Sequence, residues 1–173
     1  MNKQLILNAL GFNVVWFAWA LGVPATQLIV PTILSLLFVG WHLKTSLIAK
    51  HDLKLMAISF GAGLVLDSVL QSLELVQFAA INPKPFDGLQ PWWMTLMWMA
   101  FACTLNHSMA WLGRLHWLLS VFISGVFGYL SYVAAAKLGT LQIASGYAPI
   151  VALFSFWALF IPLVQKVKMN SKA

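Results

Sequence analysis

Residues 4–43 read QLILNALGFNVVWFAWALGVPATQLIVPTILSLLFVGWHL, a stretch of forty residues without Asp, Glu, Lys or Arg. Further charge-free stretches cover residues 88–113, 115–136 and 138–165. A helix rises about 1.5 Å per residue and the hydrocarbon core of a bilayer is about 30 Å thick, so about twenty apolar residues cross it. The sequence therefore predicts a polytopic membrane protein.

The composition points the same way, since 61% of the residues are hydrophobic, 8% are charged and the mean hydropathy is +0.87. The 173 residues leave little chain outside the apolar stretches, so we predict a single transmembrane domain, residues 1–173. A net charge of +6 would suggest nucleic-acid binding in a soluble protein. Membrane proteins instead concentrate Lys and Arg in short cytoplasmic loops, and we predict no nucleic-acid partner.

Breaks at Gly, Pro and polar clusters divide the chain into six predicted transmembrane helices. Gly22 and Pro24 separate the first two helices, and the turn-rich segment Asn82–Gly88 connects the third to the fourth. The predicted helices cover about residues 4–21, 25–41, 55–78, 91–112, 115–138 and 147–164. The predicted fold class is thus an all-α bundle of six transmembrane helices.

The basic residues predict the orientation of this bundle. With six spans both termini lie on one side, together with the loops around residues 42–54 and 113–116. Eight basic residues then fall on that side: Lys3, Lys44, Lys50, Lys54, Arg114, Lys166, Lys168 and Lys172. Only Lys84 and Lys137 fall on the other, which predicts cytoplasmic termini. Two aromatic belts are also expected, from Trp19, Trp92 and Trp93 outside and from Trp41, Trp111 and Trp117 inside.

The helix at 55–78 carries a polar stripe, because Gly63, Asp67, Gln71 and Glu74 follow one another at helical spacing. Acidic residues within a membrane span usually face the bundle interior or a water-filled cavity. One interpretation is a proton-binding, substrate-binding or catalytic stripe centred on Asp67. The other is that the carboxyl groups only fasten neighbouring helices together.

His107, flanked by Asn106 and Ser108, is the second candidate. A neutral imidazole offers one donor and one acceptor, so His107 is a candidate to relay a proton or to orient Asp67, and equally a candidate structural hydrogen-bonding node. We predict no metal site, because His42, His51 and His116 are expected in or beside loops and no HxxxH pair is present. Without a phosphate-binding or nucleophile motif, no cofactor is predicted.

The helix at 115–138 carries small residues, Ser120, Ser124, Gly128 and Ser131, along one face. Small residues let helix backbones approach closely, so this face is predicted to be a packing seam. Polar side chains beside it and in the first helix are candidates to line a polar cavity: Asn13, Tyr129 and Tyr132.

Several motifs together resemble a family of small bacterial inner-membrane proteins of uncharacterised function. They are Gly63 to Asp67, Pro91-Trp92-Trp93-Met94, Asn106-His107-Ser108 through Trp111, Gly125 to Tyr132, and Lys137-Leu138-Gly139. The resemblance covers essentially the whole chain and implies a multi-pass location in the bacterial inner membrane. It also implies an association with enzymes similar to cyclopropane-fatty-acid synthase, and so a link to membrane-lipid modification.

Three functional hypotheses remain open at this point. A lipid-modifying enzyme, or its membrane accessory, would use Asp67 and His107 as acid–base partners on a lipid substrate entering from the bilayer. A small transporter would use Asp67 and Glu74 as proton or cation sites. A structural subunit that binds another membrane protein would need neither carboxylate.

Overall fold

The computed structural model describes residues 3–79 and 88–170, without the side chains of residues 167–170. The described chain forms six α-helices, one 3-10 helix and two short strands, which confirms the helical architecture. In order the elements are α1 (Lys3–Gly22), α2 (Ile29–Thr45), α3 (Ala49–Ser72), β1 (Val76–Phe78), α4 (Trp92–Leu105), η1 (Ala110–Arg114), α5 (Trp117–Lys137), β2 (Leu141–Ile143) and α6 (Tyr147–Asn170).

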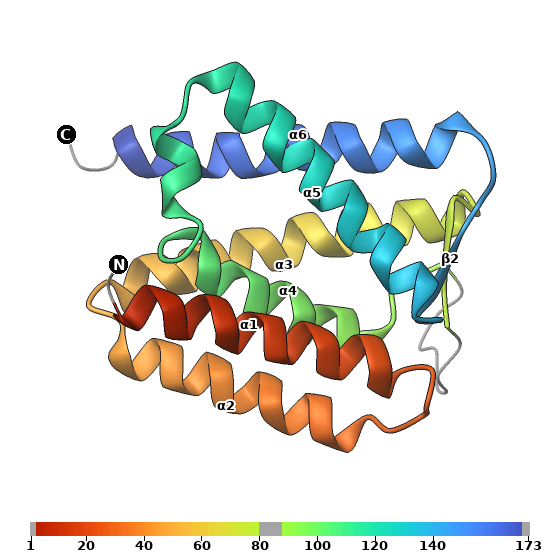
Figure 1. Cartoon of the computed structure of the whole chain (residues 1–173), viewed down its shortest axis with the longest axis horizontal. Coiled ribbons are helices and arrows are strands. Elements are labelled where there is room, and N and C mark those ends of the chain that lie inside the picture. Colours follow the sequence, from red (N-terminus) through yellow and green to blue (C-terminus); the bar gives the residue numbers. More distant parts are fainter. Residues whose placement is uncertain (1–2, 80–87, 171–173) are drawn as a thin grey trace.

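Successive helices run back and forth through the bundle (Figure 1). The beginning of α1 and the end of α6 therefore lie at one end of the bundle, together with the α2–α3 turn and η1, whereas β1 and β2 lie at the other end. The two strands pair antiparallel, with Val76 opposite Ile143 and Phe78 opposite Leu141. This small sheet was not predicted, because three residues are too few for an alternating pattern to stand out.

Four helices, α1, α3, α5 and α6, are long and apolar enough to cross a membrane. The other two are shorter, with 17 residues in α2 and 14 in α4. At about 1.5 Å per residue α4 extends about 21 Å, less than the thickness of the hydrocarbon core. This helix packs against α1, α2 and α3, and nine of its residues are buried, so it forms the centre of the bundle.

The largest difference from the predicted boundaries concerns α3. It begins at Ala49 rather than near Leu55 and ends at Ser72 rather than at Phe78. The chain leaves the helix where Glu74 adopts a φ of 56° and the Leu75 amide donates to the Leu70 carbonyl, a helix-ending arrangement. The polar residues after Ala49 suggested a loop, but they form the first turns of the helix.

The remaining boundaries shift for local reasons. Helix α2 begins at Ile29 rather than near residue 25, after a turn in which Thr26 has a φ of 56°. Helix α4 ends at Leu105 instead of continuing to residue 112, because the amides of His107 and Met109 both donate to the Thr104 carbonyl. Helix α6 continues to Asn170, beyond the predicted end at residue 164. The connector at 82–87 lies outside the described residues.

Aromatic stacking organises the core. Trp98 of α4 and Trp157 of α6 stack with ring centroids 5.1 Å apart and planes within 6°. Trp19 of α1 and Trp93 of α4 stack at 5.6 Å, and both are buried. These two tryptophans were expected in the outer aromatic belt, but they pack inside the bundle because the central helix α4 lies beside α1.

The small-residue face of α5 packs on α6. A Cβ atom built on Gly128 would lie 2.0 Å from Cγ of Trp157, and one built on Gly125 would lie 2.7 Å from Cε2 of Phe154. Only glycine permits aromatic rings this close to the helix backbone. This contact sets the close distance between α5 and α6.

Candidate functional site

Asp67 lies in the bundle interior with none of its surface exposed. The hydroxyl of Tyr132 donates to Oδ1 of Asp67 at 2.6 Å, and Nε1 of Trp98 donates to Oδ2 at 2.7 Å. Gly63, one turn earlier on α3, makes room for this tryptophan, because a Cβ atom there would lie 2.2 Å from Cε2 of Trp98. Asp67 therefore joins α3, α4 and α5 through one carboxylate.

Gln90, which is buried and precedes α4, is the third neighbour of this carboxylate. When the side-chain amide of Gln90 is oriented so that its nitrogen and its oxygen both have hydrogen-bond partners, the nitrogen donates to Oδ2 of Asp67 at 3.1 Å. The oxygen then accepts from the Thr95 hydroxyl at 3.3 Å. Within the described ranges, no Lys, Arg or His forms an ion pair with Asp67. The carboxylate is held by neutral donors alone.

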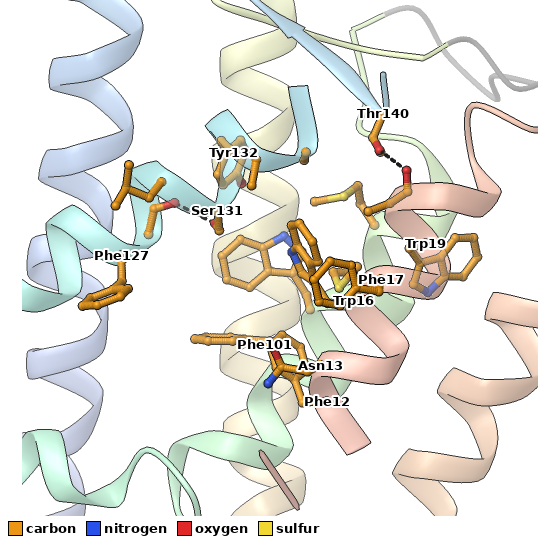
Figure 2. Close-up of a pocket in the computed structure, with 18 of the residues that line it drawn as sticks. Phe12, Asn13, Trp16, Phe17, Trp19, Phe101, Phe127, Ser131, Tyr132 and Thr140 are labelled. Carbon is orange, nitrogen blue, oxygen red and sulfur yellow. Dashed lines mark hydrogen bonds between the residues drawn. The ribbon is translucent and has the colours of Figure 1, made fainter. Parts of the chain in front are cut away.

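A cavity of about 510 Å³ lies beside this cluster, bounded mainly by α1, α4 and α5. Figure 2 shows Phe12, Asn13, Trp16 and Phe17 of α1 on one side and Phe127, Ser131 and Tyr132 of α5 on another. The lining is largely aromatic and aliphatic, with Tyr132 as its one titratable side chain among the described residues. Tyr132 and Trp98 both line the cavity and both donate to Asp67, so they connect its wall to the carboxylate.

The cavity opens through the side of the bundle, between α1 and α5. Four of its lining residues are exposed: Asn13, Phe17 at 52%, Phe127 at 68% and Leu130 at 47%. Asn13, Phe127 and Leu130 lie near the middle of their helices, whereas Phe17 lies toward the end of α1. An occupant would therefore enter from the side of the bundle and at mid-height.

The other residues of the predicted polar site separate into different surroundings. Gln71 is buried and donates to the Leu89 carbonyl at 2.7 Å. Glu74 lies beyond the end of α3 and is exposed, so it does not extend the buried stripe. Asn13 lines the cavity from an exposed position and donates to the Ala9 carbonyl at 2.8 Å. Tyr129 packs against the core, outside the cavity lining.

His107 belongs to a second polar cluster, centred on Asp52 in the first turn of α3. Asp52 is fully buried, and its Oδ2 lies 3.1 Å from Nε2 of His42 and 3.0 Å from Nε2 of His107. The Ser46 hydroxyl donates to the same oxygen at 2.5 Å, and Nδ2 of Asn106 donates to Oδ1 at 2.8 Å. The structure thus pairs His107 with Asp52, and pairs Asp67 with Tyr132 and Trp98.

Asn8 of α1 completes the second cluster. Its Nδ2 donates to the Cys103 carbonyl at 3.1 Å and lies 3.2 Å from Nδ1 of His42. Its Oδ1 accepts from the Ser108 hydroxyl at 2.6 Å. Through Asn8 and Asp52 this cluster joins α1, α2, α3 and the segment after α4.

Sequence reasoning missed this cluster because its members come from four separate segments and because residues 50–54 resembled a cytoplasmic loop. One signal was present. Asp52 is the single acidic residue among Lys44, Lys50 and Lys54, and an acidic residue is favoured in the first turn of a helix.

Comparisons with known proteins give a family but no activity. No curated protein and no solved structure matches the chain. A family model described as "Protein of unknown function (DUF2878)" matches residues 5–163. Because that match covers nearly the whole sequence, the chain belongs to this family of proteins of unknown function, which confirms the resemblance noted from its motifs.

Proposed function

We propose that the protein crosses the bacterial inner membrane six times with both termini in the cytoplasm. Four helices are long and apolar enough for spanning, and α2 and α4 lie alongside α1 within the same bundle. The six-span assignment of the sequence puts eight of the ten basic residues on the cytoplasmic side, as the positive-inside rule requires.

Reporter fusions test this orientation. A reporter attached at Ala173 should be active only if it is of the kind that works in the cytoplasm, and a tag inserted near Asp87 should be accessible from outside; both positions lie outside the described residues. A periplasmic carboxyl terminus would contradict the six-span arrangement.

We further propose that the protein binds the apolar chain of a membrane lipid and takes part in lipid modification. The observation that carries this proposal is the apolar cavity of about 510 Å³ whose exposed rim lies midway along α1 and α5. Its volume is within the range of ligand-binding pockets. A side opening at mid-bilayer depth is surrounded by lipid chains, so the molecules that reach it are those dissolved in the membrane.

The chemistry available to such a ligand is acid–base chemistry at Tyr132 and Asp67. The side chain of Tyr132 lines the cavity, and its hydroxyl donates a hydrogen bond to Asp67, which lies outside the cavity lining. In this proposal Tyr132 contacts the ligand and Asp67 exchanges a proton with it through Tyr132. Asp52, rather than Asp67, is the partner of His107, so the proposal does not use His107 at this site.

A proton- or cation-coupled transporter has less support. It required Asp67 and Glu74 along one path, but Glu74 is exposed at the end of α3. A structural subunit is the remaining alternative, in which Asp67 only fastens α3, α4 and α5 together.

Site-specific photo-crosslinking tests lipid binding directly. A photoreactive phenylalanine analogue at Phe127, on the cavity rim, should crosslink to membrane lipid. The yield of crosslinked lipid should fall when Ala135→Trp fills the cavity. The same analogue at Phe122 is the matched control, because Phe122 is exposed on α5 but does not line the cavity. If Ala135→Trp changed crosslinking at neither Phe127 nor Phe122, the proposal would be contradicted. Ala57→Trp, on the exposed face of α3, controls for the effect of adding an indole ring.

Lipid modification is tested by comparing whole-cell lipid composition with and without the gene, and with Asp67→Asn. This change keeps the shape of the side chain and removes its ability to ionise. If Asp67 takes part in proton transfer, Asp67→Asn should abolish the lipid difference while the amount of folded protein stays near wild type. Full complementation by Asp67→Asn would support the structural alternative instead.

A further inference from the structure

We propose that His42, Asp52 and His107 bind one divalent transition-metal ion, and that Zn²⁺ is the ion that matches the site best. This inference is independent of the lipid proposal, because it concerns the cluster at the terminal end of the bundle and not the cavity beside Asp67.

The three ligand atoms converge on one point from three separate segments. Nε2 of His42 comes from α2, Oδ2 of Asp52 from α3 and Nε2 of His107 from the turn after α4, and all three lie within 4.8 Å of one another. The oxygen lies 3.1 Å and 3.0 Å from the two nitrogens. Tetrahedral bonds of about 2.0–2.1 Å place neighbouring ligands about 3.3 Å apart, so small movements suffice to admit an ion.

The number of donors around Oδ2 of Asp52 exceeds the number of its lone pairs, which favours a metal ion over hydrogen bonds alone. A carboxylate oxygen offers two lone-pair sites. Oδ2 is approached by three donor groups, the two imidazoles and the Ser46 hydroxyl, whereas Oδ1 receives Asn106. A metal ion bound to both imidazoles would occupy one lone pair of Oδ2 and leave the other for Ser46. The crowding of donors at Oδ2 is then resolved.

The donor set also suits this class of ion. Two imidazoles and one carboxylate are typical ligands of Zn²⁺ and of neighbouring transition metals, whereas Mg²⁺ and Ca²⁺ prefer oxygen ligands. Three protein ligands leave a fourth tetrahedral position for water or another oxygen. His42 and Asp52 are buried, and His107 is 22% exposed, so His107 is the ligand beside which solvent approaches.

Asn8 is the group that would orient His42. Coordination through Nε2 leaves the imidazole hydrogen on Nδ1, which then needs an acceptor. Nδ1 of His42 lies 3.2 Å from the side-chain amide of Asn8, and rotation of that amide presents its oxygen in place of its nitrogen. We therefore expect metal binding to be accompanied by rotation of Asn8, which loses its contacts to the Cys103 carbonyl and the Ser108 backbone amide, while the Ser108 hydroxyl changes from donor to acceptor.

The experiment uses the full chain, purified in detergent, stripped with a chelator and titrated with Zn²⁺ by calorimetry. Wild-type protein should bind one ion per chain, and His107→Ala and Asp52→Asn should each weaken binding by about 100-fold or more, with Asn8→Leu weakening it by about 10- to 100-fold. The matched controls are His51→Ala and His116→Ala, since both histidines are exposed and lie outside the cluster.

Co²⁺ absorption of the wild type provides a readout that does not depend on whether a variant folds. Bound Co²⁺ should give the visible bands of a tetrahedral site with nitrogen and oxygen ligands. The proposal would be overturned if neither Zn²⁺ nor Co²⁺ bound to the wild-type protein at one ion per chain. It would also be overturned if His51→Ala or His116→Ala weakened binding as much as His107→Ala.

Discussion

Asp52 and Asp67 lie fifteen residues apart on the same helix, and both side chains are fully buried, yet their surroundings differ. Asp52 is surrounded by two imidazoles, a hydroxyl and an amide at the end of the bundle. Asp67 is surrounded by aromatic donors and one amide, beside an apolar cavity. Burial alone therefore does not distinguish a binding site for a cation from a site for an apolar ligand.

The difference lies in what each carboxylate has available to balance its charge. The neighbours of Asp52 include groups that can carry or coordinate positive charge, and those of Asp67 do not. Removing a buried carboxylate costs stability when several donors lose their acceptor. The cost is smaller beside a cavity, where those donors have space to reorient. We therefore expect the Asp52 cluster to matter more for stability and the Asp67 cluster more for activity.

The largest expected effect separates the two carboxylates by stability. Asp52→Ala leaves both imidazoles, Ser46 and Asn106 without their acceptor and should cost about 3–5 kcal/mol. Asp67→Ala should cost less, because Tyr132 lines the cavity and can turn its hydroxyl into it. Unfolding of the two variants in detergent measures the difference, and a larger loss for Asp67→Ala would reverse our comparison.

The next effect concerns the seam that positions Tyr132 beside Asp67. Gly128→Leu inserts a side chain where even a Cβ atom would lie 2.0 Å from Trp157, and should cost about 1–3 kcal/mol. Gly61→Leu is the matched control, because a Cβ atom at Gly61 has no atom within 4 Å. Thermal unfolding in detergent should show a lower midpoint for Gly128→Leu only; similar midpoints would place the seam on another face of α5.

The smallest effect tests the hydroxyl that connects the cavity wall to Asp67. Tyr132→Phe removes the donor at 2.6 Å and should cost about 1–2 kcal/mol together with the lipid-dependent phenotype. Tyr129→Phe is the matched control, because Tyr129 lies on the same helix but outside the cavity lining. It should change neither stability nor phenotype. An unchanged phenotype in Tyr132→Phe would remove Tyr132 from the proposed chemistry while leaving the cavity in place.

Part of the site was predictable from residue type and spacing. Asp67, Gln71, Asn106, His107 and Tyr132 were chosen because polar groups in apolar helices need partners, and each of them makes a polar contact in the bundle. Their partners were not predictable. His107 was matched with Asp67 because both were expected within the membrane, but the early end of α4 carries His107 to the end of the bundle beside Asp52.

Residue composition and segment length were sufficient to predict long apolar helices, because the length and hydrophobicity that a membrane requires are local properties of each segment. The uneven distribution of basic residues was also visible in the sequence. Which polar groups contact one another depends on how the helices pack. Asp52, His42, His107 and Asn8 come from four segments, and their contact depends on the rotation and offset of packed helices. The cavity beside Tyr132 arises in the same way, because its walls belong to helices whose separation is set by the contacts of Gly63 with Trp98 and of Gly128 with Trp157.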